Sequence, residues 1–155
     1  MTNQAFSRLA IDVSALTSVT AFKCTKNLGY ELAIIRGYRE VYCLNPGVQR
    51  VWLDIEINPS SGNWNSGQVR KRQILKEFHT AWKFTGWNFG IYSQTITGDK
   101  NWVLDSSLPL WYSIYDKNPV LNNYRPFGGW TQGTGKQYDG DAMLYGTRLD
   151  KNLLD

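Results

Sequence analysis

The stretch Val51-Trp52-Leu53-Asp54-Ile55-Glu56-Ile57 alternates aliphatic side chains with aromatic and acidic ones, which predicts a β-strand. Successive side chains of a strand point to opposite faces, so the four aliphatic residues share one face and Trp52, Asp54 and Glu56 share the other. Burying two carboxylates is costly unless they are paired or used. The acidic face is therefore either the solvated side of an edge strand or an acid/base pair whose neighbours separate the two pKa values.

Two further predicted strands carry carboxylates. Leu9–Ser14 places Asp12 opposite its aliphatic face, and Thr147–Asn152 carries Asp150. In barrels of parallel strands, catalytic groups come from the C-terminal ends of several strands. We expect these two carboxylates to meet Asp54 and Glu56 in one concave pocket, with Glu56 the more buried of its pair and its pKa raised by burial and by its like-charged neighbour.

The rest of the chain predicts an α/β protein in which short strands alternate with a few helices. Helices are expected over Val19–Asn27 and from about Ser66 to Thr85, followed by Gly29 and Gly86. No linker or internal repeat divides the chain, which indicates a single domain over residues 1–155. The other expected strands are Glu31–Tyr38, Val41–Leu44, Asn88–Ser93, Leu110–Tyr115 and Lys136–Asp139.

Composition excludes several classes of protein. Of the 155 residues, 42% are hydrophobic and only 19% are charged, so the chain is not a disordered one. No apolar run approaches the length of a membrane span, and no signal peptide is visible. The net charge of +4 suits a polyanion such as a bacterial wall, but the basic residues are scattered. Their one cluster, Arg70-Lys71-Arg72, fits a solvated helix face, so nucleic-acid binding is not favoured.

The two cysteines and the single histidine do not indicate a catalytic or metal-binding site. Cys24 and Cys43 lack metal-ligand spacing and are either one disulfide or two buried thiols. His79 lies within the longer expected helix and is interpreted as structural. No metal or organic cofactor is required by any pattern in the chain.

Aromatic residues gather at the predicted strand ends. Each ring alone fits a core position, because aromatic side chains dominate protein cores. Several rings beside acidic strand ends favour a cleft in which they stack on sugar rings. These residues are Tyr92, Trp111, Tyr115, Trp130 and Tyr138.

The order of short motifs resembles glycoside hydrolase family 25, the Chalaropsis-type lysozymes, in particular their invertebrate and amoebozoan branch. The matching motifs extend over nearly the whole chain. They are IDVS (11–14), GYELAIIRGY (29–38), VWLDIE (51–56), FGIYS (89–93), PLWYSIYD (109–116), FGGW (127–130), KQYDGD (136–141) and RLDKN (148–152).

This resemblance implies a flattened TIM-like (β/α)5(β)3 barrel that hydrolyses the β-1,4 bond between N-acetylmuramic acid and N-acetylglucosamine in bacterial peptidoglycan, for defence or digestion. It implies that Glu56 is the general acid and that Asp54, Asp12 and Asp150 complete the acidic site. Tyr92, Trp111 and Gln137 match positions that line the substrate groove. Family members are secreted or lysosomal, or act in phagosomes, and the expected oligomeric state is a monomer.

One segment departs from the family pattern. Only Arg39 and Glu40 separate two expected strands, whereas parallel neighbours need a crossover of about a dozen residues or more. The barrel is therefore expected to be shortened between its second and fourth strands. Ile34, Ile35, Val41 and Leu44 are the apolar residues expected to be uncovered, which would favour dimerisation. The alternative function is then a weak or inactive homologue that binds glycan or regulates.

Overall fold

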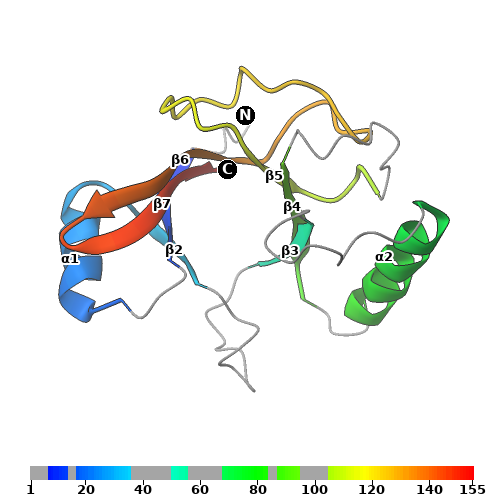
Figure 1. Ribbon diagram of the computed structural model, residues 1–155, viewed down its shortest axis with the longest axis horizontal. Coiled ribbons are helices and arrows are strands. Elements are labelled where there is room, and N and C mark those ends of the chain that lie inside the picture. The colour runs from blue at the N-terminus through cyan, green and yellow to red at the C-terminus, as the bar shows by residue number, and fades with distance from the viewer. Residues whose placement is uncertain (1–6, 14–16, 36–49, 56–67, 84–86, 95–104) are drawn as a thin grey trace, which may run out of the picture.

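The computed structural model describes residues 7–13, 17–35, 50–55, 68–83, 87–94 and 105–155. Within them, seven strands form one sheet, curled into an open arch with a helix beside each end (Figure 1). The elements are β1 (Arg8–Val13), α1 (Val19–Asn27), β2 (Leu32–Ile35), β3 (Val51–Ile55), α2 (Gln68–Lys83), β4 (Phe89–Gln94), β5 (Leu110–Ser113), β6 (Gly135–Leu144) and β7 (Thr147–Leu154).

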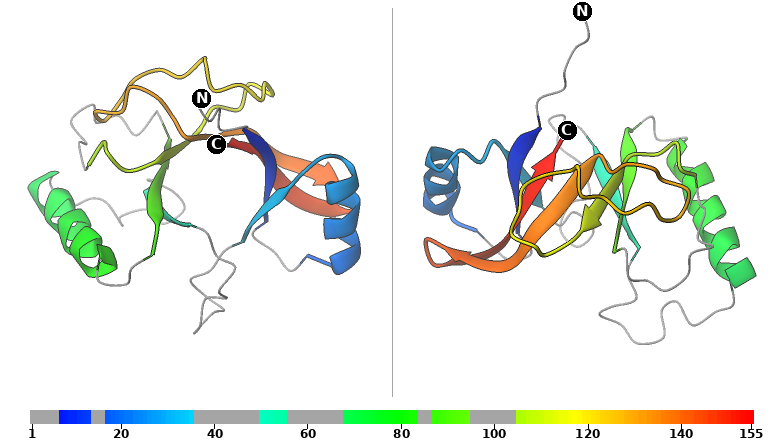
Figure 2. Two further views of the ribbon diagram at one scale, coloured as in Figure 1. Left: turned by 180° about the vertical axis from the view of Figure 1, so that it is seen from behind. Right: turned by 90° about the horizontal axis from the view of Figure 1, so that it is seen from above.

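The strand order β2-β1-β7-β6-β5-β4-β3 makes β2 and β3 the two edges of this described sheet. β1 and β2 run parallel, as do successive neighbours from β3 to β6. β7 is antiparallel to both β1 and β6 and joins the two parallel groups. The sheet thus opens between β2 and β3, where the sequence predicts a shortened barrel, and Val41–Leu44 lies outside the described residues (Figure 2).

Local sequence signals account for the ends of several elements. Ser18 caps α1 by accepting a hydrogen bond from the Ala21 backbone N–H at 3.1 Å, and Gly29 follows the helix with a φ of 89°. The β6–β7 hairpin turns through Tyr145 and Gly146, whose φ values are both positive, as tight hairpin turns require. The expected helix over Val19–Asn27 is confirmed, and the longer one is confirmed over Gln68–Lys83.

The two faces of the sheet bury separate apolar clusters. On the concave face, Ala10, Tyr92, Trp111 and Leu154 pack together, and Leu32, Ile34 and Trp52 pack against them. Ile34 is therefore half-buried rather than uncovered, contrary to the expectation from the sequence. The convex face carries one cluster beneath segment 114–134 and another near α1, centred on Tyr112 and Ile11 respectively.

A buried cation holds segment 114–134 to the sheet. Lys136 on β6 is fully buried, and its Nζ donates to both Asp116 carboxylate oxygens at 2.7 and 2.8 Å. The same ammonium donates to the Asn118 carbonyl at 2.8 Å and to Asn123 Oδ1 at 3.2 Å. Because every proton of the ammonium has an acceptor, the charge is tolerated inside the protein.

Candidate functional site

Two of the predicted site carboxylates lie side by side on the concave face. Asp12 on β1 and Asp150 on β7 are paired residues of an antiparallel ladder. Gln137 on β6, 2% exposed, donates from Nε2 to Asp150 Oδ2 at 3.1 Å and to Asp12 Oδ2 at 3.5 Å. The expectation that Asp150 would reach the site from the C-terminal end of its strand is not met. It lies in the middle of β7, and the antiparallel pairing of that strand brings it opposite Asp12, near the C-terminal end of β1.

The amide of Gln137 is fully used. Its Oε1 accepts hydrogen bonds from the hydroxyl groups of Tyr92 and Tyr115, both at 2.8 Å. Since ionised carboxylates only accept and the tyrosine hydroxyls here donate, only this orientation of the amide satisfies all four contacts. Gln137 therefore fixes the relative positions of side chains from β1, β4, β7 and the segment after β5.

Burial affects the charge of Asp150. Desolvation raises the pKa of its carboxyl above the ordinary value, and the nearby carboxylates of Asp141 and Asp139 act in the same direction. A hydrogen bond of 2.7 Å from the Asp141 backbone N–H to Asp150 Oδ1 opposes this rise. The net effect is that the proton of Asp150 is held more strongly than that of an ordinary aspartic acid.

Aromatic rings form a wall beside the carboxylates. The rings of Tyr92 and Trp111 are 4.3 Å apart between centroids, and Trp52 meets Trp111 edge-on at 5.7 Å. Trp111 Nε1 donates to Oδ1 of the fully buried Asn152 at 3.0 Å. Tyr92, Trp111, Tyr115 and Gln137 are thus brought together, as the sequence and its family resemblance predicted.

The acidic pair of β3 is described only in part. Asp54 is exposed near the C-terminal end of this edge strand, and Tyr92 of β4 is its partner in the ladder. Trp52, on the same face, packs into the concave cluster, whereas Leu53 and Ile55 pack on the convex side. The predicted alternation of faces is therefore confirmed. Glu56 lies outside the described residues, so its burial and its pKa stay predictions.

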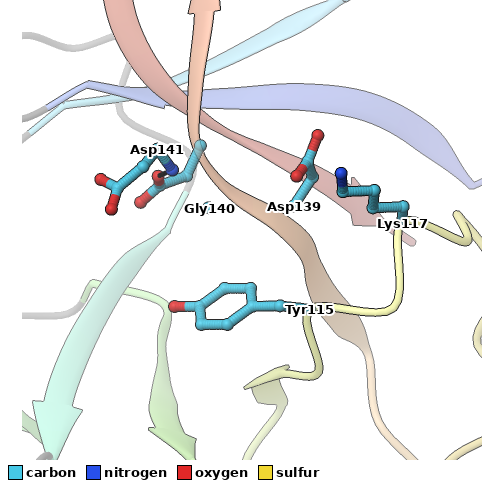
Figure 3. Close-up of a pocket in the computed structure, with 6 residues that line it drawn as sticks. Tyr115, Lys117, Asp139, Gly140 and Asp141 are labelled. Atoms are coloured by element: carbon cyan, nitrogen blue, oxygen red, sulfur yellow. Dashed lines mark hydrogen bonds between the residues drawn. The ribbon is translucent and has the colours of Figure 1, made fainter.

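A pocket of about 280 Å³ adjoins the carboxylate cluster and shares Asp150 with it. Figure 3 shows the ring of Tyr115 facing the stretch Asp139–Asp141 of β6, with Lys117 at the rim. Asp139 pairs with Lys151 at 2.9 Å, and Asp141 pairs with Arg148 at 2.8 Å. The charges of these rim carboxylates are thereby balanced.

Two of the predicted aromatic contacts do not fit a groove on the concave face. Tyr138 is buried beside Tyr30, and desolvation together with a hydrogen bond to Tyr30 raises the pKa of its hydroxyl. Trp130 belongs to the convex core and donates from Nε1 to the Leu108 carbonyl at 2.8 Å. Tyr138 faces away from the concave side because neighbouring residues of a strand face opposite sides and Gln137 takes the concave one, and Trp130 packs in the convex core, so both rings are structural.

The remaining candidates are simple to place. His79 meets the ring of Phe89 edge-on at 5.4 Å, and Cys24 is a half-buried free thiol on α1, while Cys43 lies outside the described residues. In the described part of the chain, no three His, Cys, Asp or Glu side chains are grouped so that they could hold a metal ion. No helix there is long and apolar enough to cross a membrane.

Comparison with known proteins identifies the family. The family model described as "Lysozyme-like protein 1" matches residues 41–138. The chain belongs to this lysozyme-like family. Among relatives, "Probable GH family 25 lysozyme 5" of Dictyostelium discoideum is 29% identical over 97% of this chain and 92% of the relative. The resemblance to glycoside hydrolase family 25 is thereby confirmed.

Other relatives of this lysozyme-like chain carry different names. "Counting factor 45-1" of Dictyostelium discoideum is 32% identical over 70% of this chain and 38% of its own length. A solved structure, the spore cortex lytic enzyme SleM of Clostridium perfringens, aligns with a TM-score of 0.49 and 19% identity over 67% of this chain and 36% of that chain.

The alignment with the first of these relatives also bears on the shortened barrel. The alignment extends over 202 positions, although this chain has only 155 residues. Tens of residues of the relative are therefore aligned with gaps in this chain. The lysozyme-like chain is therefore shorter than this relative inside the aligned region. This agrees with a sheet that opens between β2 and β3.

Proposed function

We propose that this protein is a muramidase that hydrolyses the β-1,4 bond between N-acetylmuramic acid and N-acetylglucosamine in bacterial peptidoglycan. The observation that carries the proposal is the pair Asp12 and Asp150, held on a concave face by the buried amide of Gln137. Two carboxylates brought together on a concave face are costly to bury, whereas glycosidases work through pairs of carboxyl groups. The family of the chain supports the same reading.

In this proposal each carboxyl has a role. Glu56 protonates the leaving glycosidic oxygen as general acid. Asp54 or Asp150 supports the oxocarbenium-like centre, either directly or by orienting the 2-acetamido group of the substrate. The hydroxyls of Tyr92 and Tyr115 position Gln137, the buried rings of Trp111 and Tyr92 support the site from below, and the exposed ring of Tyr115 offers apolar surface to the sugars. The fold would be a (β/α)5(β)3 barrel that lacks part of its wall between β2 and β3, and the protein would act as a monomer.

The site of action follows from the substrate. We propose that the protein is secreted or delivered to lysosomes or phagosomes, where bacterial walls are met in digestion or innate defence. Fractionation of the source cells would test this, and a protein confined to the cytosol would contradict it.

The test is a turbidity-clearing assay on purified bacterial walls. Glu56→Gln should lower the clearing rate by about a hundredfold or more, because general acid catalysis contributes on this scale. Asp150→Asn should also slow clearing. Glu31→Gln, the same change at an exposed position immediately before β2, is the matched control and should clear walls at the wild-type rate. Wild-type clearing that persists in Glu56→Gln would refute the catalytic assignment.

One observation favours a second function, that of a non-catalytic glycan-binding or regulatory protein. Asp54 sits on an edge strand of the described sheet, and a displacement of about 1 Å in a catalytic group can cost about a hundredfold in rate. A wild-type protein that binds walls, loses binding on replacement of the exposed pocket residue Tyr115 by Ala, and clears no walls would establish this second function and exclude the first.

A further inference from the structure

The segment after β5 is fastened to β6 from both faces of the sheet at the same place. On the convex face, the ammonium of Lys136 donates to both carboxylate oxygens of Asp116. On the concave face, the hydroxyl of Tyr115 donates to Gln137 Oε1 at 2.8 Å. Lys136 and Gln137 are neighbours on β6, and neighbouring residues of a strand face opposite sides. The buried ion pair and the hydrogen bond of the candidate site therefore lie back to back.

The backbone that carries Tyr115 is not a regular strand. The Asp116 N–H donates to the Ile114 carbonyl at 2.9 Å, which makes Tyr115 the central residue of a three-residue turn. Lys117 follows with a φ of 57°, a left-handed conformation that is unfavourable for a residue with a side chain. Figure 3 shows both residues beside the stretch of β6 that lines the pocket. A backbone of this kind persists only where surrounding contacts impose it.

Asp116 supplies these contacts. Its Oδ1 accepts a hydrogen bond from the Asn118 backbone N–H at 3.0 Å, which closes the turn around Lys117. Lys136 reaches the same turn from the sheet, because its Nζ also donates to the Asn118 carbonyl at 2.8 Å and to Asn123 Oδ1 at 3.2 Å. The position of the turn is thus set by a fully buried ammonium on β6.

Stability alone does not account for a cation at this position. Removing a charged pair from water is costly, and well-packed apolar residues in place of a buried ion pair are often as stable or more stable. The ion pair supplies a fixed geometry, since one position of Lys136 Nζ serves four acceptors at 2.7–3.2 Å. The side chain of the candidate site that this geometry places is Tyr115, the neighbour of Asp116 in the chain.

We propose that Lys136 and Asp116 are positioning residues of the candidate site, which act from the convex face through Tyr115. The proposal rests on the proposed function, to which it adds two residues outside the concave face. The Tyr115 hydroxyl restrains the amide of Gln137, and this amide donates from Nε2 to Asp150 at 3.1 Å. A turn that relaxes withdraws the hydroxyl, so the amide turns more freely and holds the charged form of Asp150 less well.

The test variant is Asp116→Asn, which keeps the shape of the side chain and one acceptor oxygen but removes the charge. We expect it to raise the pKa of Asp150 by about half a pH unit or more, a fraction of what a full hydrogen bond to a charged group contributes. Removing a negative charge acts by itself in the opposite direction, because like charges raise the pKa of a carboxyl. A carbon-13 NMR titration of Asp150 measures the direction and the size of the change.

The matched control is Asp105→Asn. Asp105 also accepts a hydrogen bond from the backbone N–H two residues further on, that of Ser107, at 3.0 Å, but it precedes β5 instead of following it. This control should leave the titration of Asp150 unchanged. Asn123→Ala is a milder variant that removes one acceptor of Lys136 at an exposed residue, and it should raise the pKa of Asp150 by a smaller amount. Circular dichroism and thermal unfolding show which variants are folded.

A double-mutant cycle with Tyr115→Phe tests whether the effect passes through the tyrosine hydroxyl. Tyr115→Phe alone should raise the pKa of Asp150 about as much as Asp116→Asn does. When both changes are combined, Asp116→Asn should add less than about half of its single effect, because residues that act through one contact are not additive. Additive effects would overturn the proposal. An unchanged or lowered pKa of Asp150 in folded Asp116→Asn and Asn123→Ala would overturn it as well.

The outcome is separable from that of the proposed function, because the titration needs no turnover. If the pKa of Asp150 responds as expected but the wild type clears no walls, the positioning role stands and the muramidase proposal fails. If wall clearing depends on Glu56 while the titration of Asp150 is the same in wild type and Asp116→Asn, the positioning role fails and the muramidase proposal stands.

Discussion

Replacing Gln137 with Met tests whether its amide controls the charge of the carboxylate pair. Methionine has a similar length but offers no amide donor or acceptor. The substitution removes the 3.1 Å hydrogen bond from the amide to Asp150 and the longer contact of 3.5 Å to Asp12. It also removes the amide oxygen that accepts the buried hydrogen bond of the Tyr92 hydroxyl. A hydrogen bond to a charged group contributes about 1.5–3 kcal/mol, and a neutral one about 1 kcal/mol. We expect the free energy of unfolding near pH 7 to fall by about 2–4 kcal/mol.

The pH dependence of this loss distinguishes an electrostatic role from simple packing. Burial raises the pKa of Asp150, so the folded protein binds its proton more strongly than the unfolded chain does. The charged carboxylate therefore lowers stability above the folded pKa, and this cost disappears as the pH falls below the ordinary value for Asp. Without the amide donor the pKa should rise further, so the loss should be larger near pH 7 than near pH 4 by about 1 kcal/mol or more.

Urea unfolding of wild type and variant at both pH values measures the difference, and a carbon-13 NMR titration of Asp150 measures the pKa directly. Gln73→Met is the matched control, because Gln73 donates from Nε2 to Glu77 Oε1 at 3.0 Å on the exposed side of α2. It should change stability by less than about 0.5 kcal/mol at either pH. An equal loss at both pH values for Gln137→Met would refute the reasoning.

Two further substitutions test the scaffold. Lys136→Met should lower the free energy of unfolding by about 3 kcal/mol, because it breaks the ion pair with Asp116, in which the cation is fully buried. Urea unfolding measures this loss, and a loss below about 1 kcal/mol would contradict the anchoring role of Lys136. The stability of the same variant should depend less on acid. Burial works to raise the pKa of Asp116, but the hydrogen bonds from Lys136 outweigh burial and hold that pKa low. The stability that this pair contributes is therefore present above the ordinary pKa of Asp and is lost as the pH falls through the lowered value. Gly90→Ala should destabilise the protein by about 1–3 kcal/mol and change tryptophan fluorescence. The added methyl group would overlap the Trp52 ring and lie 2.8 Å from the Pro109 carbonyl oxygen. Unchanged fluorescence would show that the Trp52 ring is placed differently.

Periodicity predicted most of the regular elements. The helix over Val19–Asn27 was predicted with Gly29 as its end, and the alternation in Val51–Ile55 predicts which side chains face the concave side. The antiparallel direction of β7 could not be read in the same way, because a strand pattern contains no information about direction. That direction decides where Asp150 lies, so the sequence predicted its proximity to Asp12 for the wrong reason.

The sequence predicted which residues belong to the candidate site better than it predicted the contacts between them. Gln137 was found through a motif match, but its four hydrogen bonds depend on β6 lying between β5 and β7. Tyr138 was assigned to the cleft as an aromatic residue at a predicted strand end, but it adjoins Gln137, and adjacent residues of a strand face opposite sides. The buried Lys136 gave no signal, since its acceptors come from turns of segment 114–134 that have no periodic pattern.

The position of β7 has a consequence for how the chain folds. β7 joins the β1–β2 pair to the four parallel strands of the described sheet, and its last residue, Leu154, pairs with Arg8 at the start of β1. During synthesis, β1 and β2 therefore wait for the final strand before they can dock, with the apolar side chains Ala10 and Ile11 left in water meanwhile. Contacts between residues so distant in sequence make folding slow. A ribosome that stalls before Thr147 would release a chain without the strand that joins its two parallel groups and without Asp150.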